Sequence, residues 1–158
     1  MPTMNETASE TTRELTITRL FDAPRELVFR CWTDPDHLAS WFGPAGFTAP
    51  SVTAKAVEGG AWRICIRGAD GAEHWASGVY VEVVAPERLV FSFRWDAEGE
   101  GPEPEDTLVT IAFADRDGKT EMAFHQSGFA SDASRDGHVE GWRESFDDLT
   151  AQLGKEQS

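Results

Sequence analysis

The stretch DGHVEGWRESFDDLTAQL, residues 136–153, decides how the rest of this chain folds. Apolar residues recur in it at steps of three and four, namely Val139, Trp142, Phe146, Leu149 and Leu153. This spacing places them on one stripe of a helix, and such a stripe must be buried. At ~1.5 Å per residue the helix spans roughly 27 Å, the width of a small domain, so we expect it to cross a whole sheet. We expect Ser134 or Asp136 to cap its start and Gly154 to follow its end.

Upstream of this helix, most of the chain has the period of two that is typical of strands. A first strand is predicted at 14–21, and further strands at 52–57, 61–67, 74–84, 88–95, 107–114 and 120–126. Between the first strand and the others, Pro24 and Pro35 suit the first turns of two short helices, the second capped by Asp34. Sequential strands with helices at the ends predict an α+β domain, in which helix covers one face of an antiparallel sheet.

Length and composition indicate one domain. The chain has 158 residues, of which 40% are hydrophobic, enough for one core. We expect the domain to cover 14–153, between a disordered tail at 1–13 and a short C-terminal tail at 154–158. The acidic, Gly/Pro-rich segment 96–106 is predicted to be a flexible loop, and whether it closes over a pocket stays open. Because no basic, apolar leader and no apolar run of ~20 residues is visible, we expect a cytoplasmic protein.

The charge balance disfavours two classes of partner. The formal net charge is -14, from 28 acidic and 14 basic residues. A chain this acidic is repelled by nucleic acid and by anionic membrane surfaces, so we predict neither as a partner. Cys31 and Cys65 lie far apart without a metal-binding or redox spacing, and we interpret both as small buried hydrophobic residues.

The sequence offers no catalytic or metal-binding motif. The four histidines, His37, His74, His125 and His138, do not share metal-ligand spacing on one element. A nucleophile elbow, a phosphate-binding loop and a dinucleotide fingerprint are all absent, and no acid and base pair stands out. We therefore predict no metal, no cofactor and no identifiable catalytic residue. A structural role for His125 is favoured over a role as a base.

Several segments, in this order, carry a resemblance: FDAPRELVFRCWTDPDHLASWFGPAGF (21–47), GGAW (59–62), SGVYVEVVAPERLVFSF (77–93), GKTEMAFHQSGF (118–129) and GWRESFDDL (141–149). They resemble the activator of heat-shock-protein-90 ATPase homologue-like family, within the START-like (SRPBCC) superfamily. The resemblance implies a helix-grip fold, in which a curved antiparallel sheet of about six or seven strands wraps around a long C-terminal helix, with two short helices after the first strand. It implies fold more than activity, because this superfamily includes lipid carriers, cyclases, resistance proteins and co-chaperones.

A cavity between sheet and helix is the candidate site. The strand alternation and the resemblance place the same aromatic and aliphatic side chains inside, and His125 lies in a family-like segment. The predicted ligand-binding residues are Trp41, Phe42, Trp62, Ile64, Ile66, Phe91, Phe93, Trp95, His125, Trp142 and Phe146. We predict that they bind a small hydrophobic or aromatic molecule. Two alternatives stay open: a co-chaperone-like module with a chaperone or other protein as partner, and a cyclase- or hydrolase-type enzyme with His125 as its base.

Overall fold

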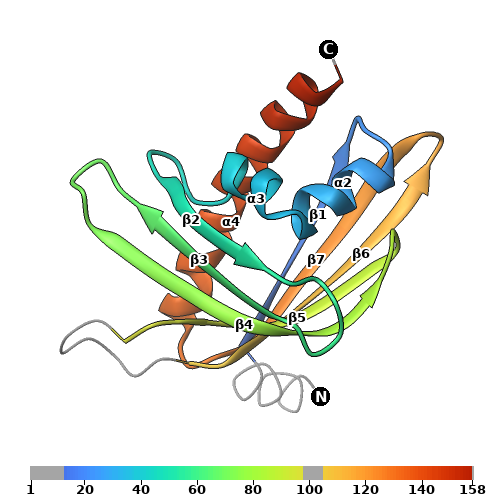
Figure 1. The fold of residues 1–158 in the computed structure, drawn as a ribbon. Helices are drawn as coiled ribbons and strands as arrows, with labels where there is room; N and C mark the ends of the chain where they lie inside the picture. Colours follow the sequence, from blue (N-terminus) through green and yellow to red (C-terminus); the bar gives the residue numbers. More distant parts are fainter. Residues whose placement is uncertain (1–12, 98–104, 158) are drawn as a thin grey trace, which may run out of the picture.

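The computed structural model describes residues 13–97 and 105–157. Most of the predicted disordered tail and the middle of the predicted 96–106 loop therefore lie outside the described residues. Figure 1 shows the described chain as one curved sheet with helices on its concave side. None of the helices in the described ranges combines the length and the hydropathy that a membrane-spanning segment needs.

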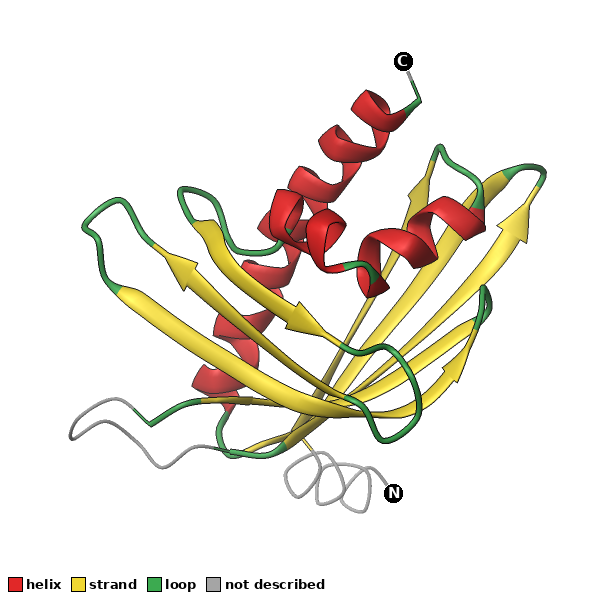
Figure 2. Ribbon diagram, viewed as in Figure 1, coloured by secondary structure: helices red, strands yellow, loops and turns green. Residues whose placement is uncertain are grey.

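The sheet has seven strands, all paired antiparallel, in the order β1-β7-β6-β5-β4-β3-β2. Their bounds are β1 Arg13–Phe21, β2 Thr48–Ala54, β3 Ala61–Arg67, β4 Glu73–Val84, β5 Arg88–Trp95, β6 Thr107–Arg116 and β7 Lys119–Phe129. Helices α2 (Arg25–Thr33) and α3 (Pro35–Trp41) follow β1, and the long α4 (Asp132–Glu156) ends the chain. The sheet curves around α4 (Figure 2). The predicted α+β helix-grip fold is confirmed.

Alternation along the strands explains why the sheet forms. In β6, Val109, Ile111 and Phe113 are buried, and the residues between them are exposed or partly exposed. Strand β2 was predicted too late, at 52–57, because it contains Pro50, a residue that is depleted in strands. It is an edge strand, and its register with β3 shifts between Thr48 and Ser51 around this proline. Pro50 has no backbone N–H to donate, and an edge strand tolerates this because one of its sides has no neighbouring strand.

Helix α4 is longer at both ends than its apolar stripe. Its N-cap is Ser131, whose side chain accepts a hydrogen bond from the Ser134 backbone N–H at 3.0 Å, so the predicted caps at Ser134 and Asp136 are wrong. Gly154 does not end the helix, which continues to Glu156. The final turn is held because the Gln157 amide donates to the Asp22 carbonyl oxygen at 2.9 Å. This tertiary contact replaces the glycine cap that the sequence indicated.

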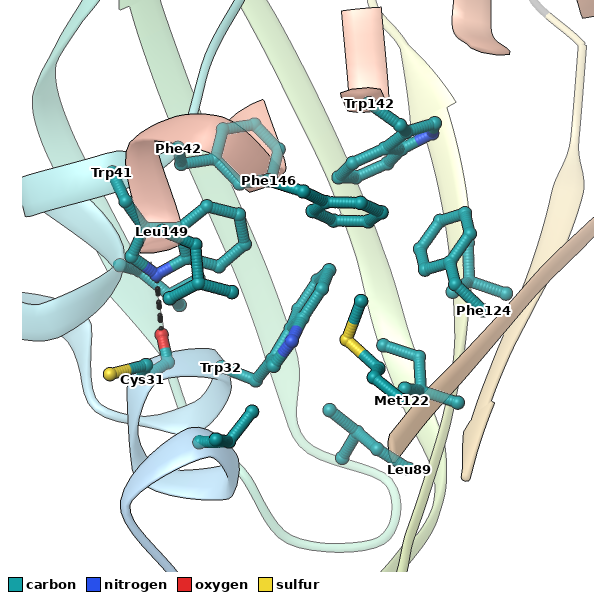
Figure 3. Packing of buried hydrophobic residues seen from close by; sticks show 14 of the residues in the cluster. Cys31, Trp32, Trp41, Phe42, Leu89, Met122, Phe124, Trp142, Phe146 and Leu149 are labelled. Carbon is teal, nitrogen blue, oxygen red and sulfur yellow. Dashed lines mark hydrogen bonds between the residues drawn. The ribbon is translucent and has the colours of Figure 1, made fainter. Parts of the chain in front are cut away.

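An aromatic cluster fills the space between the sheet and the helices. Trp32 of α2 lies at its centre, edge-on to Trp41 at 4.8 Å between ring centroids and stacked on Phe124 of β7 at 6.0 Å. Figure 3 shows Phe146 and Trp142 of α4 above the Trp32 ring. Trp32 is 2% exposed and Phe146 is fully buried, so the centre of this cluster is shielded from solvent.

Candidate functional site

A cavity of about 350 Å³ lies between α4, the sheet and the segment that follows α3. Its wall is formed by Phe42, Gly43, Pro44, Ile66, Phe93, Trp95, Ala133, Ser134, Gly137, His138, Gly141, Trp142 and Ser145. Phe42, Phe93 and Trp142 are buried, whereas Ala133 and Gly137 are exposed. The cavity therefore opens to solvent beside the first turns of α4, and buried aromatic side chains form its inner wall.

Small residues on one face of α4 create this space. Ala133, Gly137, Gly141 and Ser145 follow one another at steps of four, so they share a face of the helix. A Cβ atom built on Gly137 or on Gly141 would meet no neighbouring atom within 4 Å. The wall is thus open over both glycines, and a larger side chain at either position would project into free volume.

The polar side chains of the wall are already paired within the protein. The Trp95 indole N–H donates to His138 Nε2 at 3.1 Å. Because an indole nitrogen only donates, Nε2 is an acceptor, and Nδ1 carries the proton that it gives to the Ser134 carbonyl oxygen at 2.7 Å. The Ser134 hydroxyl donates to Glu105, and the Ser145 hydroxyl donates to the Gly141 carbonyl oxygen at 3.0 Å.

No aspartate, glutamate, lysine or arginine side chain among the described residues lines the cavity. At its edges, the Glu105 carboxylate accepts from the Ala130 backbone N–H, and the Glu144 carboxylate accepts from the Ala45 backbone N–H at 3.0 Å. An anionic ligand would meet no cationic partner here and would lose its hydration. The site suits a neutral molecule.

Apart from His125, the predicted site residues divide into three groups. Phe42, Ile66, Phe93, Trp95 and Trp142 line the cavity. Trp62, Ile64 and Phe91 line a separate, deeper void of about 20 Å³, which they share with Trp32, Leu38, Phe42 and Tyr80. Trp41 and Phe146 line neither space; they pack on Trp32 in the cluster, and the Trp41 indole donates to the Cys31 carbonyl oxygen at 2.9 Å.

His125 does not reach the interior. Its neighbours in β7, Phe124 and Gln126, are fully buried, so the alternation of the strand points His125 to the outer face. There its Nε2 lies 2.6 Å from a carboxylate oxygen of Glu14 on β1, and its side chain is 37% exposed. The prediction that His125 faces a cavity is therefore wrong.

Gln126 is an interior polar residue that the sequence did not reveal. Its amide oxygen accepts from the Trp142 indole at 2.8 Å, and its amide nitrogen donates to the Thr107 hydroxyl at 2.9 Å. Thr107 in turn donates to the Phe93 carbonyl oxygen at 2.7 Å. This buried chain of hydrogen bonds fixes the indole that forms part of the cavity wall.

The small-residue face of α4 and His138 were also not predicted to be part of the site. The sequence does contain a pattern that indicates this face, because Ala133, Gly137, Gly141 and Ser145 recur every four residues. A helix face is usually recognised from its large apolar residues, and small side chains do not contribute to that pattern. His138 follows Gly137 directly and pairs with Trp95 across the cavity wall. Only the structure shows that these residues border open volume.

The architecture defines the class of protein: a curved antiparallel sheet gripping a long C-terminal helix, with a cavity between them, is the START-like helix-grip arrangement. The chain belongs to the family described as activator of Hsp90 ATPase homolog 1-like protein, whose model matches residues 22–154. No curated protein matches the sequence significantly.

Solved structures from bacteria are similar over nearly the whole chain. A Chromobacterium violaceum protein is 31% identical with a TM-score of 0.80, covering 89% of this chain and 96% of that one. An Arthrobacter aurescens protein is 26% identical with a TM-score of 0.79, covering 90% and 86%. The AHSA1 protein from Silicibacter pomeroyi is 23% identical with a TM-score of 0.78, covering 90% and 99%, and at that identity it shows the fold alone.

Proposed function

We propose that this protein binds one small, neutral, apolar or aromatic molecule in the cavity between α4 and the sheet. The observation that carries the proposal is the cavity of about 350 Å³ with walls built mainly from Phe42, Phe93, Trp95 and Trp142. Pockets that bury small molecules in proteins usually measure roughly 300 to 1,000 Å³ and are mostly apolar. This cavity is at the small end of that range, so it suits a ligand of two or three fused rings.

The polar groups of the cavity wall favour a neutral ligand. The donors of Trp95, His138, Ser134 and Ser145 are already used within the protein, and the net charge of the chain is -14. The Ser145 oxygen, which donates its proton to Gly141, keeps lone pairs for one further hydrogen bond. A ligand with a hydroxyl or N–H group at that point is accommodated, whereas a carboxylate is not.

A fluorescence titration with phenylnaphthylamine, a neutral aromatic probe, tests this function. We expect saturable binding at one site with quenching of tryptophan emission. Gly141→Leu fills the cavity from the helix side, because its Cβ position is open, and should weaken binding at least about tenfold. Gly154→Leu is the matched control: it is on the same helix, its Cβ position is equally open, and it lies outside the cavity wall.

Two results would contradict the proposal: failure of the probe to bind the folded protein, or equal affinity of both leucine variants.

The family description names activation of a chaperone ATPase, and that activity is a separate candidate. It predicts a rise in chaperone ATPase turnover on adding this protein, and Gly141→Leu tells whether any such effect depends on the cavity.

A further inference from the structure

The small void behind the cavity shares one wall with it. Phe42 lines both the cavity of about 350 Å³ and the void of about 20 Å³. Its ring is packed edge-on against Trp142 at 5.6 Å and lies beside Trp41 at 5.8 Å. Phe42 directly follows α3, and Gly43 after it adopts a φ of +121°. Phe42 therefore borders both spaces, and it stands at a bend of the backbone rather than within a helix.

Trp32 lines this void, and its indole N–H is an unused hydrogen-bond donor. Its side chain is 2% exposed, and its Nε1 is the one buried side-chain nitrogen or oxygen without a partner among the described residues. Buried donors are nearly always paired, because an unpaired one loses its bond to water and gains nothing in return. The other tryptophans of the interior follow this rule: Trp41, Trp62 and Trp142 each donate to an oxygen of the protein.

Tyr80 of β4 also lines this void, and its side chain carries a hydroxyl group. The side chain is 3% exposed, and burial raises the pKa of Tyr80 to about 12, so the hydroxyl keeps its proton at neutral pH. All other side chains of this void, namely Leu38, Phe42, Trp62, Ile64 and Phe91, belong to apolar or aromatic residues. No charged side chain among the described residues lines it.

We propose that this void receives the carbonyl oxygen of an aromatic ketone or quinone, with the Trp32 indole N–H and the Tyr80 hydroxyl as its donors. A volume of about 20 Å³ is sufficient for one oxygen atom, since a single water needs roughly 10 to 15 Å³ by the same measure. The ring system of the ligand occupies the larger cavity, and its carbonyl group passes the Phe42 ring, which turns aside. This inference rests on the proposed function and specifies the ligand class.

The experiment compares two probes that differ at one atom. Acetylnaphthalene carries a carbonyl oxygen where isopropenylnaphthalene carries a CH₂ group, and the two have the same ring system and a trigonal side group of the same shape. We expect acetylnaphthalene to bind about tenfold more tightly, although it is the less hydrophobic molecule. In spectra of the indole N–H groups, its binding should move the Trp32 resonance downfield, as a new hydrogen bond does. Isopropenylnaphthalene, which offers no carbonyl oxygen to the indole N–H, should not produce this downfield shift.

Variants separate the two donors. Tyr80→Phe keeps the ring and removes only the hydroxyl, and it should reduce the preference for the ketone several-fold. Trp32→Phe identifies the Trp32 resonance and should abolish the preference for the ketone. If that variant fails to fold, the affinities of Tyr80→Phe and the wild-type spectra still test whether the carbonyl group is bound here. Equal affinity of the two probes with an unmoved Trp32 resonance overturns this inference and leaves the proposed function standing. Absence of binding by both probes overturns the two together.

Discussion

At the scale of single residues, Gln126 has the most defined role in the interior. It joins Trp142 of α4 to Thr107 of β6 through two side-chain hydrogen bonds, and all three groups are buried. Replacing it by an apolar residue would leave the Trp142 indole N–H without an acceptor, and an unpaired buried donor costs about 1 to 3 kcal/mol. This role could not be predicted from the residue type, because a glutamine in a strand is usually exposed.

We therefore expect Gln126→Leu to lower the free energy of unfolding by about 1 to 3 kcal/mol, as measured by urea denaturation. Gln152→Leu is the control, since the partly exposed Gln152 donates its amide N–H to the exposed Glu156 on the same helix at 3.0 Å. It should change stability by less than about 0.5 kcal/mol. Equal effects of the two substitutions would show that the buried amide contributes nothing specific.

The cysteines give a second prediction at this scale. Both are buried, and burial raises the pKa of Cys31 to about 12 and also raises the pKa of Cys65. Because the thiolate is the reactive form, roughly one Cys31 thiol in ten thousand is ionised at about pH 8. We expect neither cysteine to react with a thiol reagent in the native protein at this pH, and both to react once urea unfolds it. Rapid labelling of the native protein would contradict this burial.

At the scale of elements, α4 combines a packing face with a hollowed face. The apolar stripe ending in Phe146, Leu149 and Leu153 was predicted from spacing alone, and all three residues are buried. The hollow over Gly137 and Gly141 was not predicted, because small residues at steps of four do not show whether open volume lies beside them, and glycine in a helix usually indicates only lower stability. The glycines of α4 therefore keep the cavity open but lower the stability of the helix.

Alanine substitutions measure the effect of these glycines on stability and on binding separately. Gly141→Ala and Gly154→Ala each place a methyl group where no atom lies within 4 Å, and each should raise the free energy of unfolding by about 0.5 to 1 kcal/mol, since alanine is the better helix former. Only Gly141→Ala should also weaken binding of phenylnaphthylamine, because only Gly141 lines the cavity. Destabilisation by Gly141→Ala would mean that the open volume over this glycine does not exist.

At the scale of the whole molecule, the excess of acidic residues opposes folding. With a net charge of -14, like charges crowd the compact state, and salt screens that repulsion. We expect the midpoint of thermal unfolding to rise by several degrees between about 0.01 M and 0.15 M sodium chloride. A midpoint that falls with added salt would show that ion pairs such as Arg19 with Asp147 outweigh the repulsion.

The fold was predictable to a greater extent than the site. Alternation in β5 and β6 and the stripe of α4 follow local rules, so the α+β arrangement could be read from the chain. Inward direction alone does not distinguish Trp142, which borders the cavity, from Phe146, which is packed in the core one helical turn later. That difference depends on what faces each residue from other elements, and no local pattern contains it.

The most direct test of the ligand cavity follows backbone amide and indole resonances while phenylnaphthylamine is added to the labelled protein. We predict saturable shifts at the amides of Gly137 and Gly141 and at the indole of Trp95, all in the cavity wall, with little change at Gly154 or at His125 on the outer face. Saturable shifts at Gly154 and His125 with unmoved cavity resonances, or no shifts at all, would contradict the account.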